Sequence, residues 1–164
     1  MRKLSKIVAL LLAGAMAMLM FTACSGGGGS NENSEAEEKV MNQIRSKSSA
    51  AMQNDRDLQR IAAAHLEEDL KGGISIFGYK LIGKVHIEGK DKEYLTITVT
   101  ANYTYSDTLL SAILTEISKK VSTDANVDIQ QSGNWTKVGV VVKTSNTKSY
   151  MGIAFQIRNP NYNK

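Results

Sequence analysis

The sequence predicts an α+β domain: a three-layer α–β–α sandwich built around an antiparallel sheet. Two helix-like segments come first, three strand-like segments follow, and a further helix precedes two final strands, which gives the order ααβββαββ. Helices placed before and between the strands can cover both faces of one sheet. No internal repeat or second domain is evident, so we expect a single folded domain over residues 34–164.

Two helices are expected before the first strand. The first begins at Ser34, because Ser34 and Glu37 match the capping-box pattern. The second starts at Asn54 or Asp55, both favourable N-caps, and ends at the glycine pair 72–73. The apolar positions at helical spacing are Val40, Met41, Ile44 and Met52 in the first helix, and Leu58, Ile61, Ala62, His65, Leu66 and Leu70 in the second.

Three strands are expected over residues 74–81, 84–87 and 94–103, which are rich in β-branched and aromatic residues. Between Leu95 and Ala101, apolar residues alternate with threonines, a pattern typical of a half-buried strand. The residues Gly89-Lys90-Asp91 predict a hairpin turn.

A third helix and two last strands complete the domain. The helix is expected over residues 107–120, capped by Ser106 or Asp107, with an apolar side formed by Leu109, Leu110, Ile113, Leu114 and Ile117. A loop with a short helical turn over 122–134 follows. The strands are expected over 137–144 and 149–157, joined by residues 145–147.

Residues 1–23 are predicted to be an export signal rather than part of the fold. Arg2, Lys3 and Lys6 precede an apolar run of about 15 residues, which is short of the roughly 20 that a membrane-spanning helix needs. Small residues 22–23 and Cys24 then follow. This layout resembles a bacterial lipoprotein signal, although Phe21 stands where that motif has Leu. The alternative is an uncleaved N-terminal anchor with an incidental cysteine.

The resemblance implies a diacylglyceryl thioether on Cys24 and cleavage just before it. The protein would then sit on the extracytoplasmic face of the cell membrane, or on an outer membrane where the cell has one. Because Cys24 is the only cysteine, its lipidation would exclude disulfides, a catalytic cysteine and thiolate metal sites. Residues 24–33 would be the lipidated cysteine and a Gly/Ser-rich tether, whose nine residues after Cys24 reach at most about 30 Å.

The basic excess of the chain belongs mainly to the signal. Three of the 20 Lys and Arg residues and none of the 16 Asp and Glu residues lie in positions 1–23, which leaves 17 basic against 16 acidic residues, a net charge of +1. No basic run or stripe remains, so nucleic acid is not an expected partner.

Four stretches of residues 36–157 together resemble the CAP superfamily, the SCP-like extracellular domains. They are 42–45, 57–65, 101–106, and the pair 135–142 with 150–155. The resemblance implies a CAP-like sandwich with a cleft that usually holds two His and two Glu, with a metal in some members. Asn126 stands at one histidine position and Val99 at one glutamate position. It therefore implies a degenerate cleft around His65, Val99 and Asn126, with no metal and no cofactor.

The catalytic motifs that the sequence lacks also lead us to expect a domain without a metal site or catalytic residues. His65 and His86 are the only histidines, and no His-x-His, His-Glu-x-x-His or Gly-x-Ser-x-Gly pattern occurs. We interpret His65 as a structural histidine, with a cleft histidine beside one of Glu67, Glu68 or Asp69 as the alternative. These three acids are interpreted as a solvated helix end, and no catalytic residue is assigned.

We therefore expect a lipid-anchored extracytoplasmic domain that acts by binding a protein, a peptide or cell-wall material, with exposed tyrosines suited to such contact. One alternative is a cell-envelope hydrolase that uses His65 with a distant carboxylate. A second is an assembly or interaction subunit on another α+β fold.

Overall fold

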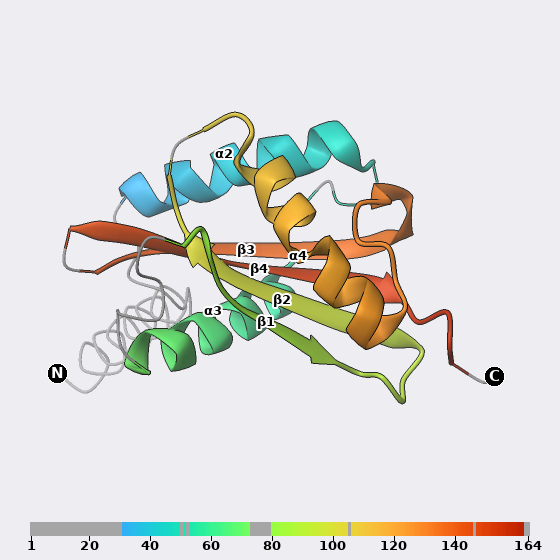
Figure 1. The fold of residues 1–164 in the computed structure, drawn as a ribbon. Helices are drawn as coiled ribbons and strands as arrows, with labels where there is room; N and C mark the ends of the chain where they lie inside the picture. Colours follow the sequence, from blue (N-terminus) through green and yellow to red (C-terminus); the bar gives the residue numbers. More distant parts are fainter. Residues whose placement is uncertain are drawn as a thin grey trace, which may run out of the picture. The chain divides into compact units, whose positions relative to one another are not determined.

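The computed structural model describes residues 31–49, 51, 53–72, 80–104, 106–145 and 147–162. Within these residues it confirms the α+β class, because three α-helices pack on a four-stranded antiparallel sheet of order β1-β2-β4-β3 (Figure 1). No helix in the described ranges is long and apolar enough to cross a membrane. The elements are α2 (Asn31–Lys47), α3 (Arg56–Lys71), β1 (Ile82–Glu88), β2 (Tyr94–Asn102), α4 (Leu109–Ala125), the 3₁₀ turn η2 (Ser132–Asn134), β3 (Trp135–Ser145) and β4 (Lys148–Arg158).

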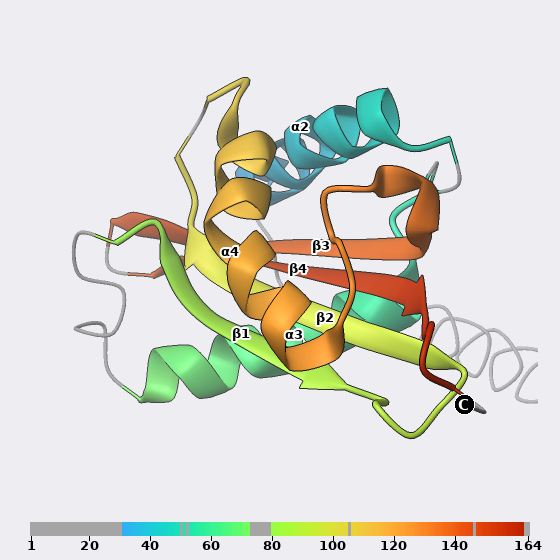
Figure 2. The same cartoon turned by 45° about the vertical axis from the view of Figure 1, so that its right-hand side comes forward.

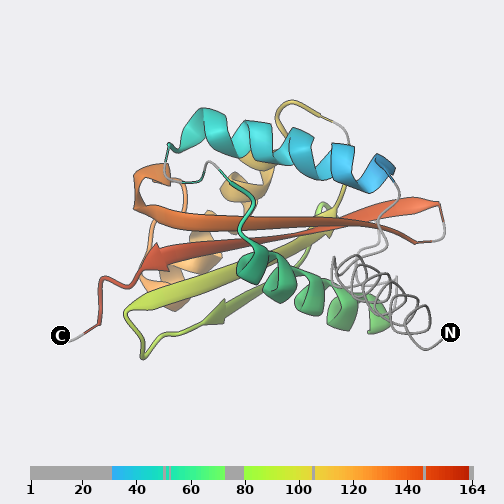
Figure 3. The same ribbon diagram turned by 180° about the vertical axis from the view of Figure 1, so that it is seen from behind.

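The helices lie on both faces of the sheet. Helix α3 packs mainly against β3 and β4, and it lies in front of the sheet when the molecule is seen from behind (Figure 3). Helices α2 and α4 contact each other and share the opposite face, where Figure 2 shows α4 crossing the strands. We refer to these as the α3 face and the core face.

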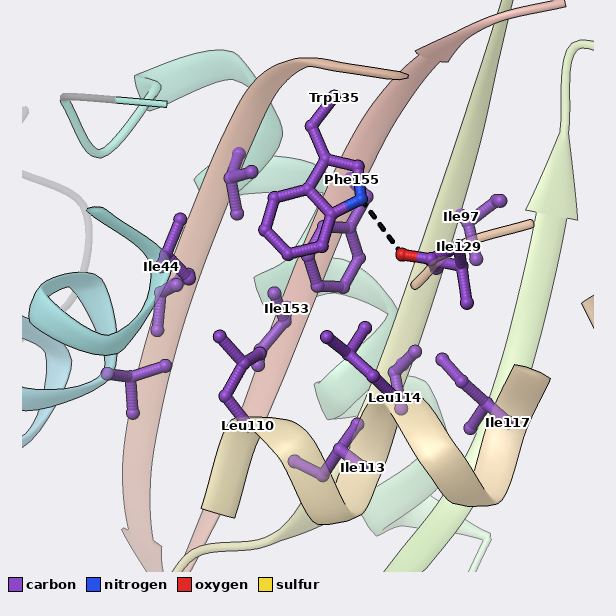
Figure 4. Packing of buried hydrophobic residues seen from close by; sticks show 14 of the residues in the cluster. Ile44, Ile97, Leu110, Ile113, Leu114, Ile117, Ile129, Trp135, Ile153 and Phe155 are labelled. Carbon is purple, nitrogen blue, oxygen red and sulfur yellow. Dashed lines mark hydrogen bonds between the residues drawn. The ribbon is translucent and has the colours of Figure 1, made fainter. Parts of the chain in front are cut away.

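The core face carries the main hydrophobic core. Strand β2 contributes Leu95, Ile97, Val99 and Ala101, and the paired positions of β4 and β3 are apolar as well. Trp135 packs against Phe155 with ring centroids 4.8 Å apart, and its indole nitrogen donates to the Ile129 carbonyl at 3.0 Å (Figure 4). The buried ring therefore keeps its one polar group paired.

The α3 face allows an unusually close approach of helix and strands. A Cβ added at Gly139 would lie 2.4 Å from the Gln59 backbone nitrogen, and one at Gly152 would lie 2.7 Å from the Ala62 carbonyl oxygen. Only residues without a side chain fit between strand and helix backbones at these two positions. This close contact buries the first half of α3 on β3 and β4.

Strand β3 lies at one edge of the sheet, and side chains cover its backbone. Val140 donates its N–H to Asn54 Oδ1 at 2.7 Å, while its carbonyl accepts from Asn54 Nδ2 and Gln59 Nε2, both at 3.0 Å. The Val142 N–H donates to Glu37 Oε1 at 3.0 Å. Burial raises the pKa of the Glu37 carboxyl, and the Val142 N–H offsets only part of that rise. Capping an edge in this way protects it from pairing with other chains.

The helix boundaries differ from those expected from the sequence. Helix α2 begins at Asn31, so Ser34 lies inside it and is not its cap, and the last residues of the expected tether are helical. Helix α4 begins after Thr108, which makes no side-chain capping bond, and extends to Ala125. Asp55 does cap α3, accepting from the N–H groups of Asp57 and Leu58 at 3.1 Å. Met52 and most of the strand expected over 74–81 lie outside the described residues.

Candidate functional site

The structure places the three residues of the expected cleft in separate regions. His65 lies on α3, on the α3 face of the sheet. Val99 is fully buried in the core on the opposite face. Asn126 is the exposed C-cap of α4, with a left-handed backbone at φ 54°. Because successive residues of a strand point to opposite faces, Val99 and the histidines cannot share one cleft.

A polar cluster, which we call the histidine cluster, joins α3 to β1 and β2. It contains His65, Glu68 and Asp69 from α3, Lys84, His86 and Glu88 from β1, and Thr100 from β2. Asp69 is its centre and has no exposed surface. Asp69 Oδ2 lies 3.0 Å from His86 Nε2 and accepts from Thr100 Oγ1 at 2.6 Å, while Asp69 Oδ1 lies 3.0 Å from Lys84 Nζ.

These contacts determine the charge state of Asp69. Burial raises the pKa of its carboxyl, but the hydrogen bonds from His86, Thr100 and Lys84 outweigh burial, so the pKa is held below its ordinary value. The expected solvated helix end therefore describes Glu67 and Glu68, which are exposed, but not Asp69.

His65 completes the cluster through ring stacking. The imidazoles of His65 and His86 stack with centroids 4.0 Å apart and planes 21° apart. His65 Nε2 lies 3.4 Å from Glu88 Oε1, and His65 Nδ1 lies 4.0 Å from Glu68 Oε2. His86 and Lys84 also border a shallow hollow of about 270 Å³ along β1, which Lys120 of α4 reaches from the other side. An aspartate beside a histidine is an arrangement that can orient a proton acceptor.

The histidine cluster does not present a set of metal ligands. Among the residues that the structure describes, no three His, Cys, Asp or Glu side chains are placed so that they could hold a metal ion. Both oxygens of Asp69 already have partners within the fold. The observed contacts are those of a buried polar network that fastens α3 to the sheet.

Sequence reasoning missed the pairing of Asp69 with His86. Two signals could have indicated it. Asp69 is four residues after His65 and so lies on the same side of α3. His86 alternates with the apolar residues of β1 and therefore points to the α3 face with Thr100.

Asn126 lines a second hollow, of about 160 Å³, which we call the amide hollow. It lies where the end of α4 meets the β1–β2 turn and the segment after β4. Its exposed lining residues are Lys90, Thr123, Asp124, Asn126 and Asn161, and its buried floor is formed by Leu95, Ala125 and Asn159.

The amide hollow has a fixed floor, and its lining side chains differ in how they are engaged within the fold: Asn161 Nδ2 donates to the Ala125 carbonyl at 3.4 Å and Thr123 Oγ1 to the Lys119 carbonyl at 2.9 Å. Asn159 Nδ2 donates to the carbonyls of Lys90 and Lys92, both at 2.9 Å, and its Oδ1 accepts from the Asn161 N–H at 2.9 Å. These bonds tie the turn to the C-terminal segment. Within the described part of the chain, the side chains of Lys90, Asp124 and Asn126 make no hydrogen bond or ion pair.

Two tyrosines are the exposed large hydrophobic residues of the described chain. Tyr162 is 43% exposed and follows Asn161 of the amide hollow. Tyr94 is 40% exposed and lies beside Leu95 in sequence, but strand alternation directs it to the α3 face. The aromatic residues Trp135, Tyr150 and Phe155 are buried, and Tyr105 lies outside the described residues.

Comparison with known proteins finds no match for this chain. No model of a protein family matches the chain. No curated protein and no solved structure matches it either.

Proposed function

We propose that this chain is a lipoprotein held on the extracytoplasmic face of the membrane through Cys24, and that its folded domain acts by binding at the amide hollow rather than by catalysis. The proposal for the anchor is supported by the basic start, the apolar run and the small residues before Cys24. Two or more acyl chains on that cysteine would make attachment stable.

The contrast between the two polar sites supports binding at the amide hollow. Asp69 of the histidine cluster has its Oδ2 in hydrogen bonds with His86 and Thr100 and its Oδ1 in an ion pair with Lys84. In the amide hollow, Asp124 and Asn126 project uncommitted donors and acceptors over a rigid floor. A few polar groups that converge on a preformed concave surface are typical of a ligand site.

We further propose that the domain is a CAP-like sandwich, but without the cleft expected around His65, Val99 and Asn126. Helices on both faces of an antiparallel sheet and the four sequence stretches support this assignment. A crystal structure that superposes on SCP-like domains with the same strand order would support it, and a different strand order in those domains would contradict it.

The binding proposal is tested with the full chain in detergent and cell-envelope material from which the lipids have been extracted, so that the acyl chains cannot hold the protein on it. We expect the wild type and the variant His65→Ala to sediment with envelope material, and the variants Asn126→Gly and Asp124→Ala to remain in the supernatant. Glycine adopts the left-handed backbone of Asn126 readily, so Asn126→Gly removes the amide without strain. Full retention of both hollow variants would contradict the proposal.

A hydrolase remains the second candidate function because one observation favours it. His65 Nε2 lies 3.4 Å from the carboxylate of Glu88, which is 23 positions later in the chain. An enzyme of this kind would release soluble fragments from envelope material, and His65→Ala would abolish the release. Equal release by the wild type and the variant, or none by either, would remove this candidate.

A further inference from the structure

We infer that the outer edge of strand β1 binds an extended peptide with two adjacent acidic residues, and that the peptide joins the four-stranded sheet as a further strand. This site is separate from the amide hollow, so the inference goes beyond the proposed function and does not rest on it. The open edge of β1, the direction of its backbone groups and a lysine on each side of the strand support it.

The two edge strands of the sheet differ in how their backbone is covered. The backbone of β3 is hydrogen-bonded to the side chains of Asn54, Gln59 and Glu37. Strand β1 is the outermost strand on the other side of the sheet (Figure 2). In the described part of the chain, no side chain bonds to the backbone of Val85 or Ile87. An uncovered strand edge is a template on which another extended chain can pair.

The pairing of β2 with β4 determines which way the backbone groups of β2 point. The Tyr103 N–H donates to the Ser149 carbonyl at 2.9 Å, and the Asn159 N–H donates to the Glu93 carbonyl at 2.8 Å. In an antiparallel pair, alternate residues direct both backbone groups to the same neighbour. The odd-numbered residues of β2 therefore bond to β4, and the even-numbered residues bond to β1.

The same alternation continues across β1. His86 and Glu88 lie opposite even-numbered residues of β2, so their N–H and C=O groups face β2. The backbone groups of Val85 and Ile87 consequently point away from the sheet. The register shift of β1 lies before Val85, so it does not interrupt this stretch. An added antiparallel strand would exchange about two hydrogen bonds with each of the two residues.

Two lysines make the hollow along this edge positive. It holds about 270 Å³ and is lined by Ile82, Gly83, Lys84, Val85, His86 and Lys120, with no acidic residue in that lining. Lys84 Nζ lies 3.0 Å from Asp69 Oδ1, which neutralises part of its charge. Lys120 is exposed and has no ion pair within the described residues. A ligand at this edge therefore meets an excess of positive charge, strongest at Lys120.

The positions of the two lysines select adjacent acidic residues. Lys84 lies on the α3 face, where it contacts Asp69, and Lys120 belongs to α4 on the core face. Successive side chains of an extended chain point to opposite faces, so two neighbouring residues of an added strand would approach one lysine each. A second copy of this chain does not fit, because its adjacent acidic residues, 37–38 and 67–69, lie in helices α2 and α3.

The test measures binding of fluorescent octapeptides to the full chain in detergent by fluorescence anisotropy. The first peptide alternates Thr and Val and has two adjacent Glu residues at its centre. Three comparison peptides replace both Glu with Gln, replace both with Lys, or separate them by one residue, which places them on the same face. The first peptide should bind at least fivefold more tightly than each of the others, and its affinity should fall as salt is added.

The backbone contribution is tested with the same peptide. Two versions carry N-methyl groups on either the odd or the even residues, and in a paired strand only one of these sets donates to β1. One version should lose at least tenfold in affinity, and the other should bind nearly as well as the parent peptide.

Neighbouring lysines of α4 supply matched protein variants. Lys120→Glu reverses a charge that lines the hollow and should weaken binding about fivefold. Lys119→Glu makes the same change outside the lining and should alter binding little. Asn126→Gly in the amide hollow should have no effect. Thermal unfolding by circular dichroism shows whether each variant is folded, and the peptide comparisons need only the wild type.

The outcomes decide between the possible occupants of the edge. Preference for adjacent Glu residues, loss of affinity with one N-methylated version and a selective effect of Lys120→Glu support the inference. Equal binding of the four peptides, equal effects of the two lysine variants, or no binding of the first peptide overturns it. A chain that sediments as a dimer which Lys120→Glu leaves intact but Val85→Pro breaks would place a second copy at the edge, and would overturn it as well.

Discussion

The imidazole rings of His65 and His86 stack face to face, with centroids 4.0 Å apart, and so join helix α3 to the edge strand β1. Beside them, Asp69 has no exposed surface and contacts His86, Lys84 and Thr100. The second half of α3 is therefore held by these polar contacts together with the burial of Leu66 beside Tyr150, whereas its first half packs closely on Gly139 and Gly152.

Asp69→Asn should destabilise the protein by about 1.5–3 kcal/mol at pH 7, the range for hydrogen bonds to charged groups. Asparagine keeps the shape of the side chain but carries no charge and has one acceptor oxygen in place of two. It therefore cannot accept from Thr100, His86 and Lys84 together. Lys84 is 46% exposed, so it can return to water, which keeps the cost below that of an isolated buried charge. Urea unfolding measures the difference. Glu68→Gln, at an exposed position of the same helix, should change stability little.

The same residue predicts a loss of stability in acid. Because the pKa of Asp69 is lower in the folded chain than in the unfolded chain, its contribution is fully present above the unfolded pKa near 3.8. The contribution is lost as the pH falls through the folded pKa. The difference in unfolding free energy between the wild type and Asp69→Asn should therefore shrink below about pH 4. A difference that stays constant down to pH 2 would contradict this assignment.

Gly152→Ala should destabilise the fold by about 1–3 kcal/mol, the usual cost of overpacking. The new methyl group would lie 2.7 Å from the Ala62 carbonyl oxygen, so α3 must move away from the sheet. Gly133→Ala is the matched control, since a Cβ at that position meets nothing within 4 Å. The melting temperatures of the two variants are compared. Equal melting temperatures would show that α3 does not pack against Gly152.

Glu37→Gln should stabilise the protein at pH 7 by about 0.5 kcal/mol. The pKa of Glu37 is raised in the folded chain, so stability falls as the pH rises from the unfolded pKa through the folded one. Glutamine keeps an acceptor for the Val142 N–H and removes the buried charge. The gain should vanish below pH 4, where Glu37 is protonated in both states.

The control for Glu37 lies two positions earlier on α2. Glu35 is exposed, and a hydrogen bond from Lys39 holds its pKa below the usual value. Glu35→Gln should therefore bring no gain at pH 7. A gain of the same size in both variants would point to the net charge of the chain and not to burial of Glu37.

Local signals were sufficient to predict much of the fold. Asp55 before a helical repeat indicates an N-cap, and the structure has it accepting from two N–H groups of α3. The alternation in β2 identifies its core face correctly. Thr98 and Thr100 are buried as well, because α3 covers the face that alternation alone assigns to solvent.

The candidate sites depend on contacts that no local pattern carries. Asp69 lies in an acidic run for which the sequence predicts exposure to solvent. Its burial depends on its partners on β1 and β2. Asn126 was singled out by resemblance to a cleft residue. Its place in the amide hollow depends on the turn near Lys90 and on Asn159 and Asn161, which lie more than 30 positions away on either side.

Acylation of Cys24 is the premise on which the proposed location of the protein depends. Intact-mass and N-terminal peptide mass spectrometry of the protein extracted from its native membrane tests it most directly. The account predicts a chain that begins at Cys24 and carries the mass of a diacylglyceryl group, with or without a further acyl chain. A chain that still begins at Met1, or a Cys24 with a free thiol, would contradict it.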